Sequence, residues 1–252
     1  ATFVEQTAVG AGLYGPAGTR VSAQEGCALR LDPSGVIRGS TSVTDQGQGT
    51  LTGIQQVIAE TLGVRFDAVY TESGDGGTTP YGGGSWASRG LAIGGEAARL
   101  ASLDLRKKIL GVAAAISQVS PEKLSMVAGE IFKDGKSLMD LAELAQIVHF
   151  RQYTLPQDLD FEMNVTRHFL PRSFPYFMAN GIQASYLEVD LGTGSIKLLD
   201  HWIVGDCGTV VNPMLVDEQL RGGIVQGLGA ALYEQAIYDN SGQLLTATLA
   251  DY

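Results

Sequence analysis

Three glycine-rich segments each run into a predicted helix, and the first of them is DQGQGT at 45–50. The N–H groups in the first turn of a helix have no acceptor within that helix, so glycines beside them make a site for an anion. The amides of Gln46 and Gln48 add donors and acceptors that can read the edge of a heterocycle. A glycine turn with a polar helix cap is the alternative that this segment alone leaves open.

The second segment, YGGGSWASR at 81–89, again leads from glycines into a predicted helix. Ser85, Ser88 and Arg89 lie at the helix start, and the planar fork of arginine N–H donors matches a phosphate group. The segment therefore predicts a second anion site, with a flexible loop tip as the alternative.

The third segment joins DCGTVVNP at 206–213 to a predicted helix that contains Gly222, Gly223, Gly227 and Gly229. Each glycine inside a helix costs about 1 kcal/mol relative to alanine. Such a sequence favours close packing of the helix against a ligand or against another backbone. Helix–helix packing without a ligand also stays open.

Other kinds of site lack their sequence signals. There is no GxxxxGK[ST] loop, no GxGxxG after a strand with the expected acidic partner, and no GxSxG. The three histidines have no metal-ligand spacing, and Cys27 and Cys207, far apart, indicate reduced thiols too few for [2Fe–2S] clusters. Asp206, Glu218 and Glu234 lie near the motifs and are interpreted as surface or supporting residues. We therefore predict no catalytic residue and no protein-ligated metal.

Composition describes a globular protein with an unusual glycine content. The 252 residues include 33 glycines, and 44% are hydrophobic, which suits one large or two smaller packed domains. The net charge of −10, with no cluster of Lys and Arg, disfavours nucleic acid and anionic membranes as partners. No apolar run approaches about 20 residues, and the N-terminal sequence has no secretory pattern. We expect a cytoplasmic protein without a membrane span.

Hydrophobic periodicity and turn residues predict hairpins with intervening helices. This pattern indicates an α+β fold, with mixed sheets and hairpins packed with helices, and not a doubly wound sheet. The predicted elements are a hairpin over 20–45, a helix over 50–62, a strand over 65–71, a glycine loop over 74–84, a helix over 87–116, a helix start at 120–122, a turn at 133–136, a helix over 137–150, strands over 183–191 and 195–204, a helix of about 25 residues after Asn212, a turn at 239–242 and a strand over 244–249.

The segment 151–176 has low periodicity and three prolines, which favours a connection over a surface. We expect a first α+β subdomain over 1–150, which carries the segments at 45–50 and 81–89. A second α+β subdomain over 177–252 carries the helix with the glycines.

Taken together, the three segments resemble the xanthine dehydrogenase/aldehyde oxidase/carbon monoxide dehydrogenase family of molybdenum hydroxylases. The similarity lies in GQGT before a helix, in ASR-x4-GGEAA, in VGDCGTVVNPMLVDEQLRGGIVQGLGAALYEQAIYDNSGQ and in the final TATLADY. It implies the C-terminal part of the large subunit, with the fold of the family's second molybdopterin-binding domain. It also implies that the chain is shorter than the family subunit at both ends.

The resemblance implies a set of residues that contact molybdopterin. Gln48 matches a glutamine beside the pterin or the molybdenum oxo group, and Gln219 matches one at the pterin edge. Residues 87–91 match the loop that holds the pterin and its phosphate, although Gly90 and Leu91 replace the Ser-Thr that the family often carries. Hydroxyl contacts are lost there, and backbone N–H contacts remain. The predicted cofactor-binding residues are Gly47, Gln48, Gly49, Ala87, Ser88, Arg89, Gly90, Leu91 and Gln219.

By the same resemblance, Asn212, Asp217 and Gly223 shape the last segment and do not touch substrate. The family's catalytic glutamate sits in a Gly-x-Gly-Glu motif, which this sequence lacks. The implied function is the molybdopterin-binding portion of an oxidoreductase that hydroxylates an aldehyde or N-heterocycle with oxygen from water, inactive alone.

The implied partners are the rest of the molybdenum subunit, subunits or domains that carry [2Fe–2S] clusters and FAD, and a small-molecule substrate. Plain molybdopterin and its cytosine dinucleotide form both stay open. The alternative is a structural or interaction module that has the same fold and no cofactor.

Overall fold

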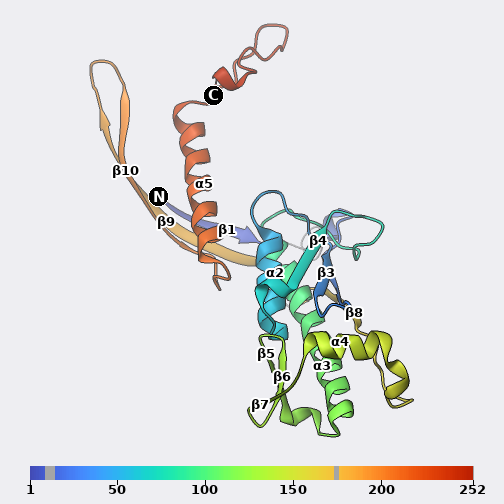
Figure 1. Cartoon of the computed structure of the whole chain (residues 1–252). Coiled ribbons are helices and arrows are strands. Elements are labelled where there is room, and N and C mark those ends of the chain that lie inside the picture. Colours follow the sequence, from blue (N-terminus) through green and yellow to red (C-terminus); the bar gives the residue numbers. More distant parts are fainter. Residues whose placement is uncertain (9–14, 173–175, 252) are drawn as a thin grey trace. The chain divides into compact units, whose positions relative to one another are not determined.

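The computed structural model describes residues 1–8, 15–172 and 176–251, and these form two compact units (Figure 1). One unit comprises Glu5–Ala179, and the other comprises Ala1–Val4 together with Asn180–Tyr252. Both mix strands with helices, which confirms the predicted α+β class.

The larger unit is built on a four-stranded sheet in the order β4-β3-β2-β8. Strand β2 pairs antiparallel with both β3 and β8, and β3 pairs parallel with β4. The strands are β2 (Glu25–Leu31), β3 (Ile37–Thr41), β4 (Val69–Ser73) and β8 (Asn164–Phe169). The predicted hairpin is confirmed for β2 and β3, whereas β8 lies inside the segment 151–176, for which the sequence predicts only a connection.

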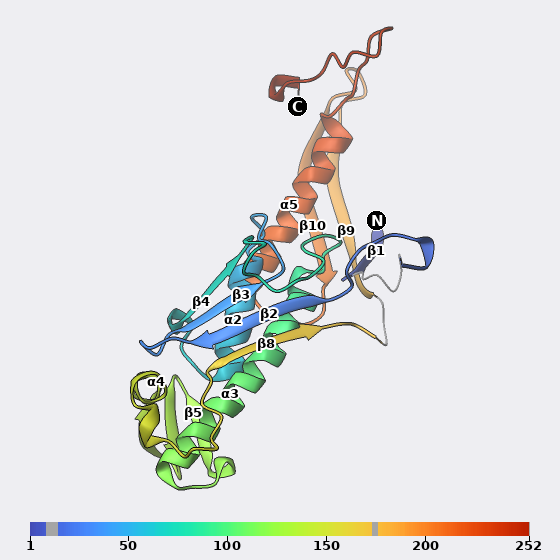
Figure 2. The same ribbon diagram turned by 90° about the vertical axis from the view of Figure 1, so that its right-hand side faces the viewer.

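Helices α2 (Thr50–Leu62) and α3 (Gly95–Ser117) pack against each other and along one face of this sheet (Figure 2). The core between them is apolar because α2 repeats buried aliphatic residues at helical spacing, such as Ile54, Ile58 and Leu62. Gly63 ends α2 in the left-handed conformation (φ 81°), as predicted. Helix α3 begins later than predicted, after a π-helical turn over Gly90–Gly94.

The larger unit also contains a three-stranded meander of β5 (Leu124–Val127), β6 (Glu130–Lys133) and β7 (Lys136–Asp140). The predicted helix start at 120–122 opens only one 3₁₀ turn, Pro121–Lys123, before the alternating residues of β5 pair with β6. The turn at 133–136 is confirmed.

Helix α4 (Leu141–Phe150) follows β7. Its N-cap is Asp140, whose carboxylate accepts from the Glu143 N–H at 2.7 Å. The sequence predicts a start at Ser137, but that residue lies in β7.

The smaller unit contains most of a three-stranded sheet in the order β1-β9-β10. The strands are β1 (Thr2–Thr7), β9 (Phe177–Val189) and β10 (Ile196–Asp206), and β9 and β10 form the predicted antiparallel hairpin. Helix α5 (Pro213–Leu232) follows, capped by the Asn212 side chain, which accepts from the Leu215 N–H at 3.2 Å. The predicted strand over 244–249 is wrong, because only an isolated bridge between Tyr238 and Leu244 forms there.

Helix α5 is exposed along most of its length, and Gly229 is its one buried residue. A Cβ atom added at Gly222, Gly223 or Gly227 would meet no atom within 4 Å among the described residues. The close packing that these glycines suggest is therefore made by nothing in the described part of the chain. No helix within those residues is long and apolar enough to cross a membrane.

Candidate functional site

Two of the three predicted segments come together in the larger unit, at the starts of α2 and of the π-helical turn before α3. The Gln46 Nε2 atom donates to the Ser85 carbonyl oxygen at 3.3 Å, and the Ser85 hydroxyl donates to the Thr44 carbonyl oxygen. A Cβ atom at Gly90 would lie 3.1 Å from Cγ2 of Thr50. The loops at 45–50 and 81–89 therefore form one surface.

The start of α2 already holds an anion, which is the carboxylate of Asp45. This carboxylate accepts from the N–H groups of Gly47 (2.8 Å) and Leu51 (3.1 Å). Burial acts to raise the pKa of Asp45, but hydrogen bonds from the backbone N–H groups of Gly47, Leu51 and Gly49 outweigh it, and the pKa is lowered. The anion site that the sequence predicts here is thus filled by the protein's own side chain.

Gln48 stands beside this cap and is half-buried. Its Oε1 atom accepts from the Gln46 N–H at 2.6 Å, which fixes the orientation of the amide. Its Nε2 atom makes no hydrogen bond to any residue that the structure describes. This amide can therefore donate to a ligand, as the sequence analysis expects of it.

The segment 87–91 begins with two residues in an unusual backbone conformation. Ala87 (φ 48°) and Ser88 (φ 52°) are both left-handed and exposed. This conformation costs about 1–2 kcal/mol for each residue that carries a Cβ atom. The Ala87 carbonyl oxygen accepts from the Ala8 N–H at 3.0 Å. Such a strained backbone persists only where contacts with the surrounding residues hold it in place.

The same segment exposes backbone donors. The N–H groups of Ser88, Gly90 and Leu91 make no hydrogen bond within the described residues, because they precede or open the helical turn. Adjacent N–H groups at a helix start bind the oxygen atoms of an anion. Here, unlike at α2, no carboxylate of the described chain fills the place.

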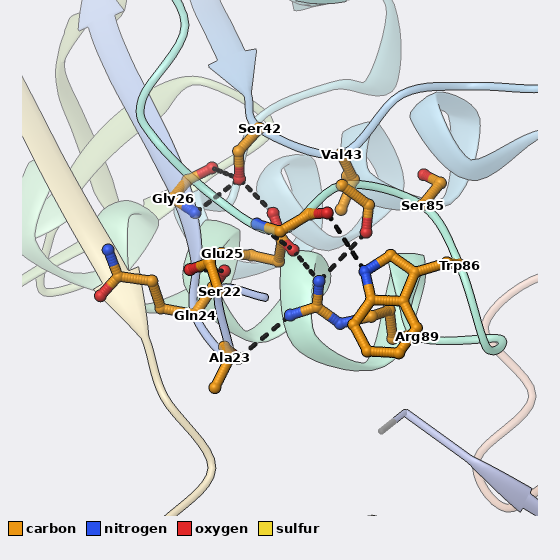
Figure 3. A network of polar contacts seen from close by, with 12 residues as sticks. Ser22, Ala23, Gln24, Glu25, Gly26, Ser42, Val43, Ser85, Trp86 and Arg89 are labelled. Carbon is orange, nitrogen blue, oxygen red and sulfur yellow. Dashed lines mark hydrogen bonds and ion pairs between the residues drawn. The ribbon is translucent and has the colours of Figure 1, made fainter. Parts of the chain in front are cut away.

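Arg89 does not present its guanidinium at this surface (Figure 3). Its side chain is fully buried in an ion pair with Glu25, whose side chain is fully buried too. Nη1 donates to Glu25 Oε1 and to the Gly84 carbonyl oxygen (3.1 Å), and Nη2 donates to the Ala23 carbonyl oxygen (3.0 Å). Burial lowers the pKa of Arg89, while the Glu25 carboxylate acts to raise it. The Arg89 side chain, for which the sequence predicts a phosphate contact, is thus buried and bonded within the protein.

Glu25 is the residue that sequence reasoning missed. Its carboxylate accepts from Arg89, from the Gly83 N–H at 3.0 Å and from the Ser42 hydroxyl. The sequence does contain a signal for it, because Glu25 is a charged residue at the start of the mostly apolar strand EGCALRL. An ionised group is rarely buried in a strand unless it is paired.

Leu91 also has a packing role. Cβ atoms at Gly53 and Gly95 would lie 3.0 Å and 3.3 Å from Leu91 Cδ1. Leu91 therefore fills the space between α2 and α3.

The third segment lies in the smaller unit. Gln219 is exposed on α5, and it lies two residues from each partner of an ion pair between Asp217 and Arg221 (2.8 Å). Asn212 caps the helix, in line with the shaping role expected of it.

No group of three or more His, Cys, Asp or Glu side chains among the described residues could hold a metal ion. Cys27 is buried and Cys207 is exposed, and both are free thiols.

Comparison with known proteins identifies the family of this chain. Residues 1–252 match the model of a family described as molybdopterin cofactor-binding domain. The chain belongs to this family. It is 31% identical to the nicotine 6-hydroxylase large subunit of Paenarthrobacter nicotinovorans over 99% of this chain and 31% of the relative. It is 30% identical to the carbon monoxide dehydrogenase large chain of Hydrogenophaga pseudoflava over 90% of this chain and 28% of the relative.

Solved structures agree. The structure is similar to quinoline 2-oxidoreductase from Pseudomonas putida 86, with a TM-score of 0.84 and 33% identity over 100% of this chain and 32% of that chain. This chain is therefore a molybdopterin-binding domain of the molybdenum hydroxylase family, and it has the fold of that domain. It spans less than a third of the length of these relatives.

Proposed function

We propose that Gln48, the loop 87–91 and Gln219 hold molybdopterin, and that the chain is the cofactor-binding portion of a molybdenum hydroxylase. One observation carries the proposal. The free N–H groups of Ser88, Gly90 and Leu91 lie on the loop that Gln46 and Ser85 tie to the Gln48 loop. Backbone donors suit the phosphate of the cofactor, and a side-chain amide suits the edge of its pterin ring.

The contacts of the two loops support different tasks for them. Asp45 keeps negative charge at the start of α2, so the phosphate belongs on the 87–91 loop and not on the 45–50 loop. Gly47 and Gly49 are left-handed (φ 105° and 78°) and let the backbone turn so that Gln48 lies beside the cap. When bound, the cofactor supplies the redox centre and the water-derived oxygen that the substrate receives.

The chain by itself is proposed to be inactive. It has no Gly-x-Gly-Glu motif, and the acidic residues near the third segment, Asp206, Glu218 and Glu234, are exposed. None of them lies in an enclosed pocket of the kind in which a general base acts on a bound substrate. The catalytic base and most of the substrate pocket are expected outside these residues, and so are the [2Fe–2S] and FAD centres of partner subunits. The cytoplasm is the expected compartment.

The test is the molybdenum and pterin content of the complete subunit, purified with its partner subunits. Gln48→Ala and Gln219→Ala should each lower the content several-fold. Gln55→Ala is the matched control, because Gln55 lies on α2 soon after the Gln48 loop but its amide donates to the Phe66 carbonyl oxygen, away from the loops. Full content in both variants would refute these contacts. A wild-type subunit that never contains molybdopterin would favour the module without a cofactor, and chromatography of the released pterin distinguishes the plain form from the cytosine dinucleotide.

A further inference from the structure

We propose that Glu25 is a positioning residue for the cofactor loop, and that through Arg89 it holds residues 82–91 in the shape that presents their N–H groups. The proposal rests on the function proposed above, since it gives that loop its ligand. Glu25 itself lies beneath the loop surface and is not expected to touch the cofactor.

The first support is the rigidity of the anchor. Glu25 is the first residue of β2, a central strand that is paired on both sides. It lies opposite Phe169 of β8 in the sheet register, and its neighbour Gly26 lies opposite His168. A carboxylate on such a strand has little freedom to move, so whatever it binds is held relative to the sheet.

The second support is that the loop is pressed against the ion pair. A Cβ atom at Gly82 would lie 2.2 Å from Glu25 Oε2, and one at Gly83 would lie 2.3 Å from Arg89 Nη1. The Gly83 N–H donates to both Glu25 Oε1 (3.0 Å) and the Gln24 carbonyl oxygen (3.1 Å). These two glycines are therefore needed for contact with the buried pair, and not only for contact with a ligand.

The third support is the strain in the loop. Ala87 and Ser88 are left-handed and lie between two fixed points, Trp86 and Arg89. The Trp86 Nε1 atom donates to the Gly83 carbonyl oxygen at 3.1 Å (Figure 3). The centroid of the Trp86 ring lies 5.1 Å from the guanidinium carbon of Arg89. If Arg89 lost its partner, one end of this strained segment would be released.

The chemistry of the pair fits a role in positioning more than in stability. Burying two charges costs desolvation that can exceed their attraction, so a buried pair is weak evidence for stability, and we infer that this pair serves the geometry of the loop. Among the residues that the structure describes, the buried Arg89 Nε atom has no hydrogen-bond partner, so this side chain is not fully satisfied even with Glu25 present. An unsatisfied buried donor costs free energy, which is a further reason to look for the purpose of the pair in the geometry of the loop.

The first experiment is hydrogen–deuterium exchange of the complete subunit, prepared without cofactor. In Glu25→Gln, which keeps the size of the side chain and removes its charge, amides of residues 82–91 should exchange at least about tenfold faster than in the wild type. Ile109→Ala is the matched control, because Ile109 is fully buried in α3 and its loss destabilises the same unit away from the loop. At equal loss of thermal stability, the control should leave the loop unchanged. Equal loop exchange in both variants would overturn the proposal.

Ser42→Ala provides a milder variant if Glu25→Gln fails to fold. It removes one donor to the Glu25 carboxylate and leaves Arg89 in place, so the loop should loosen to an intermediate extent. A folded Ser42→Ala protein with wild-type exchange in the loop would also count against the proposal.

The second experiment separates this inference from the function on which it rests. The complete subunit with Glu25→Gln should contain several-fold less molybdopterin than the wild type, while the Ile109→Ala subunit retains it. Full content in the Glu25→Gln subunit would overturn the role of Glu25 alone. Absence of molybdopterin from the wild-type subunit would overturn the proposed function instead, whatever the exchange data show.

Discussion

The side chain of Gln46 donates to the carbonyl oxygen of Ser85 at 3.3 Å, across a sequence separation of 39 residues. Together with the bond from the Ser85 hydroxyl to the Thr44 carbonyl oxygen, it ties the loop that carries Gln48 to the loop that carries Ser88. Neither bond uses the free N–H groups of Ser88, Gly90 and Leu91. The relative placement of the two loops is therefore open to test separately from their contacts with a ligand.

We expect Gln46→Ala to change the free energy of unfolding by no more than about 1 kcal/mol, because one exposed hydrogen bond is lost. The same change should speed release of molybdopterin from the complete subunit, because the loops lose one of the bonds that join them and the ligand must order them further. The measurement is the rate of pterin release after dilution, together with a denaturant titration. A release rate equal to that of wild type would show that the loops are held without this bond.

Asp45 predicts a pH dependence of stability. Its pKa is lowered in the folded protein by the backbone N–H groups of Gly47, Leu51 and Gly49, although burial opposes this. A carboxylate with a lowered folded pKa contributes stability above its unfolded pKa, and this contribution is lost as the pH falls through the folded value. Asp45→Asn should therefore lower the free energy of unfolding by about 1 kcal/mol at pH 7.

The difference between Asp45→Asn and the wild type should shrink below about pH 4, where the unfolded carboxylate begins to be protonated. Denaturant titrations between pH 7 and pH 3 measure it. Glu60→Gln removes the same charge from an exposed position near the other end of α2 and reports the general effect of charge. A difference that stays constant over this pH range would contradict the role of the Asp45 carboxylate.

Elements defined by neighbouring residues could be predicted from the sequence. Helix α2 was predicted with its observed bounds because its apolar spacing and its glycine stop are both local. Strand β8 was not predicted, because its pairing with β2 joins distant parts of the chain and its own residues are mostly exposed. The start of α3 was predicted too early, because Ala87 and Ser88 are left-handed, a conformation that alanine and serine do not signal.

The candidate site divides in the same way. The glycine loops and Gln48 could be found from residue types and spacing. The burial of Arg89 could not, because its partner Glu25 is 64 residues away and meets it only in the folded sheet. An arginine beside serines and glycines predicts a phosphate contact as readily as an ion pair, and only the tertiary structure separates the two.

The two cysteines should differ sharply in reactivity. Cys27 is 1% exposed, and burial raises its pKa to about 12, so almost no thiolate forms at neutral pH. Cys207 is exposed. We expect a thiol reagent at pH 8 to modify one cysteine per native chain and two after denaturation. Cys207→Ser should abolish the native reaction, and fast modification of Cys27 in that variant would contradict its burial.

Gly63, which ends α2, and Gly111, inside α3, predict opposite effects of the same substitution. Gly63 is left-handed (φ 81°), and a Cβ atom there would lie 2.4 Å from the Met126 carbonyl oxygen, which is a backbone atom. Gly63→Ala should therefore destabilise the protein by about 2–4 kcal/mol, from left-handed strain together with overpacking.

Gly111 lies inside α3, and a Cβ atom there would meet nothing within 4 Å among the described residues. Gly111→Ala should stabilise by up to about 1 kcal/mol, because alanine favours the helix. Denaturant titrations of both variants measure the two changes, and a tolerated alanine at Gly63 would mean that the contact between the end of α2 and strand β5 is looser than the structure shows.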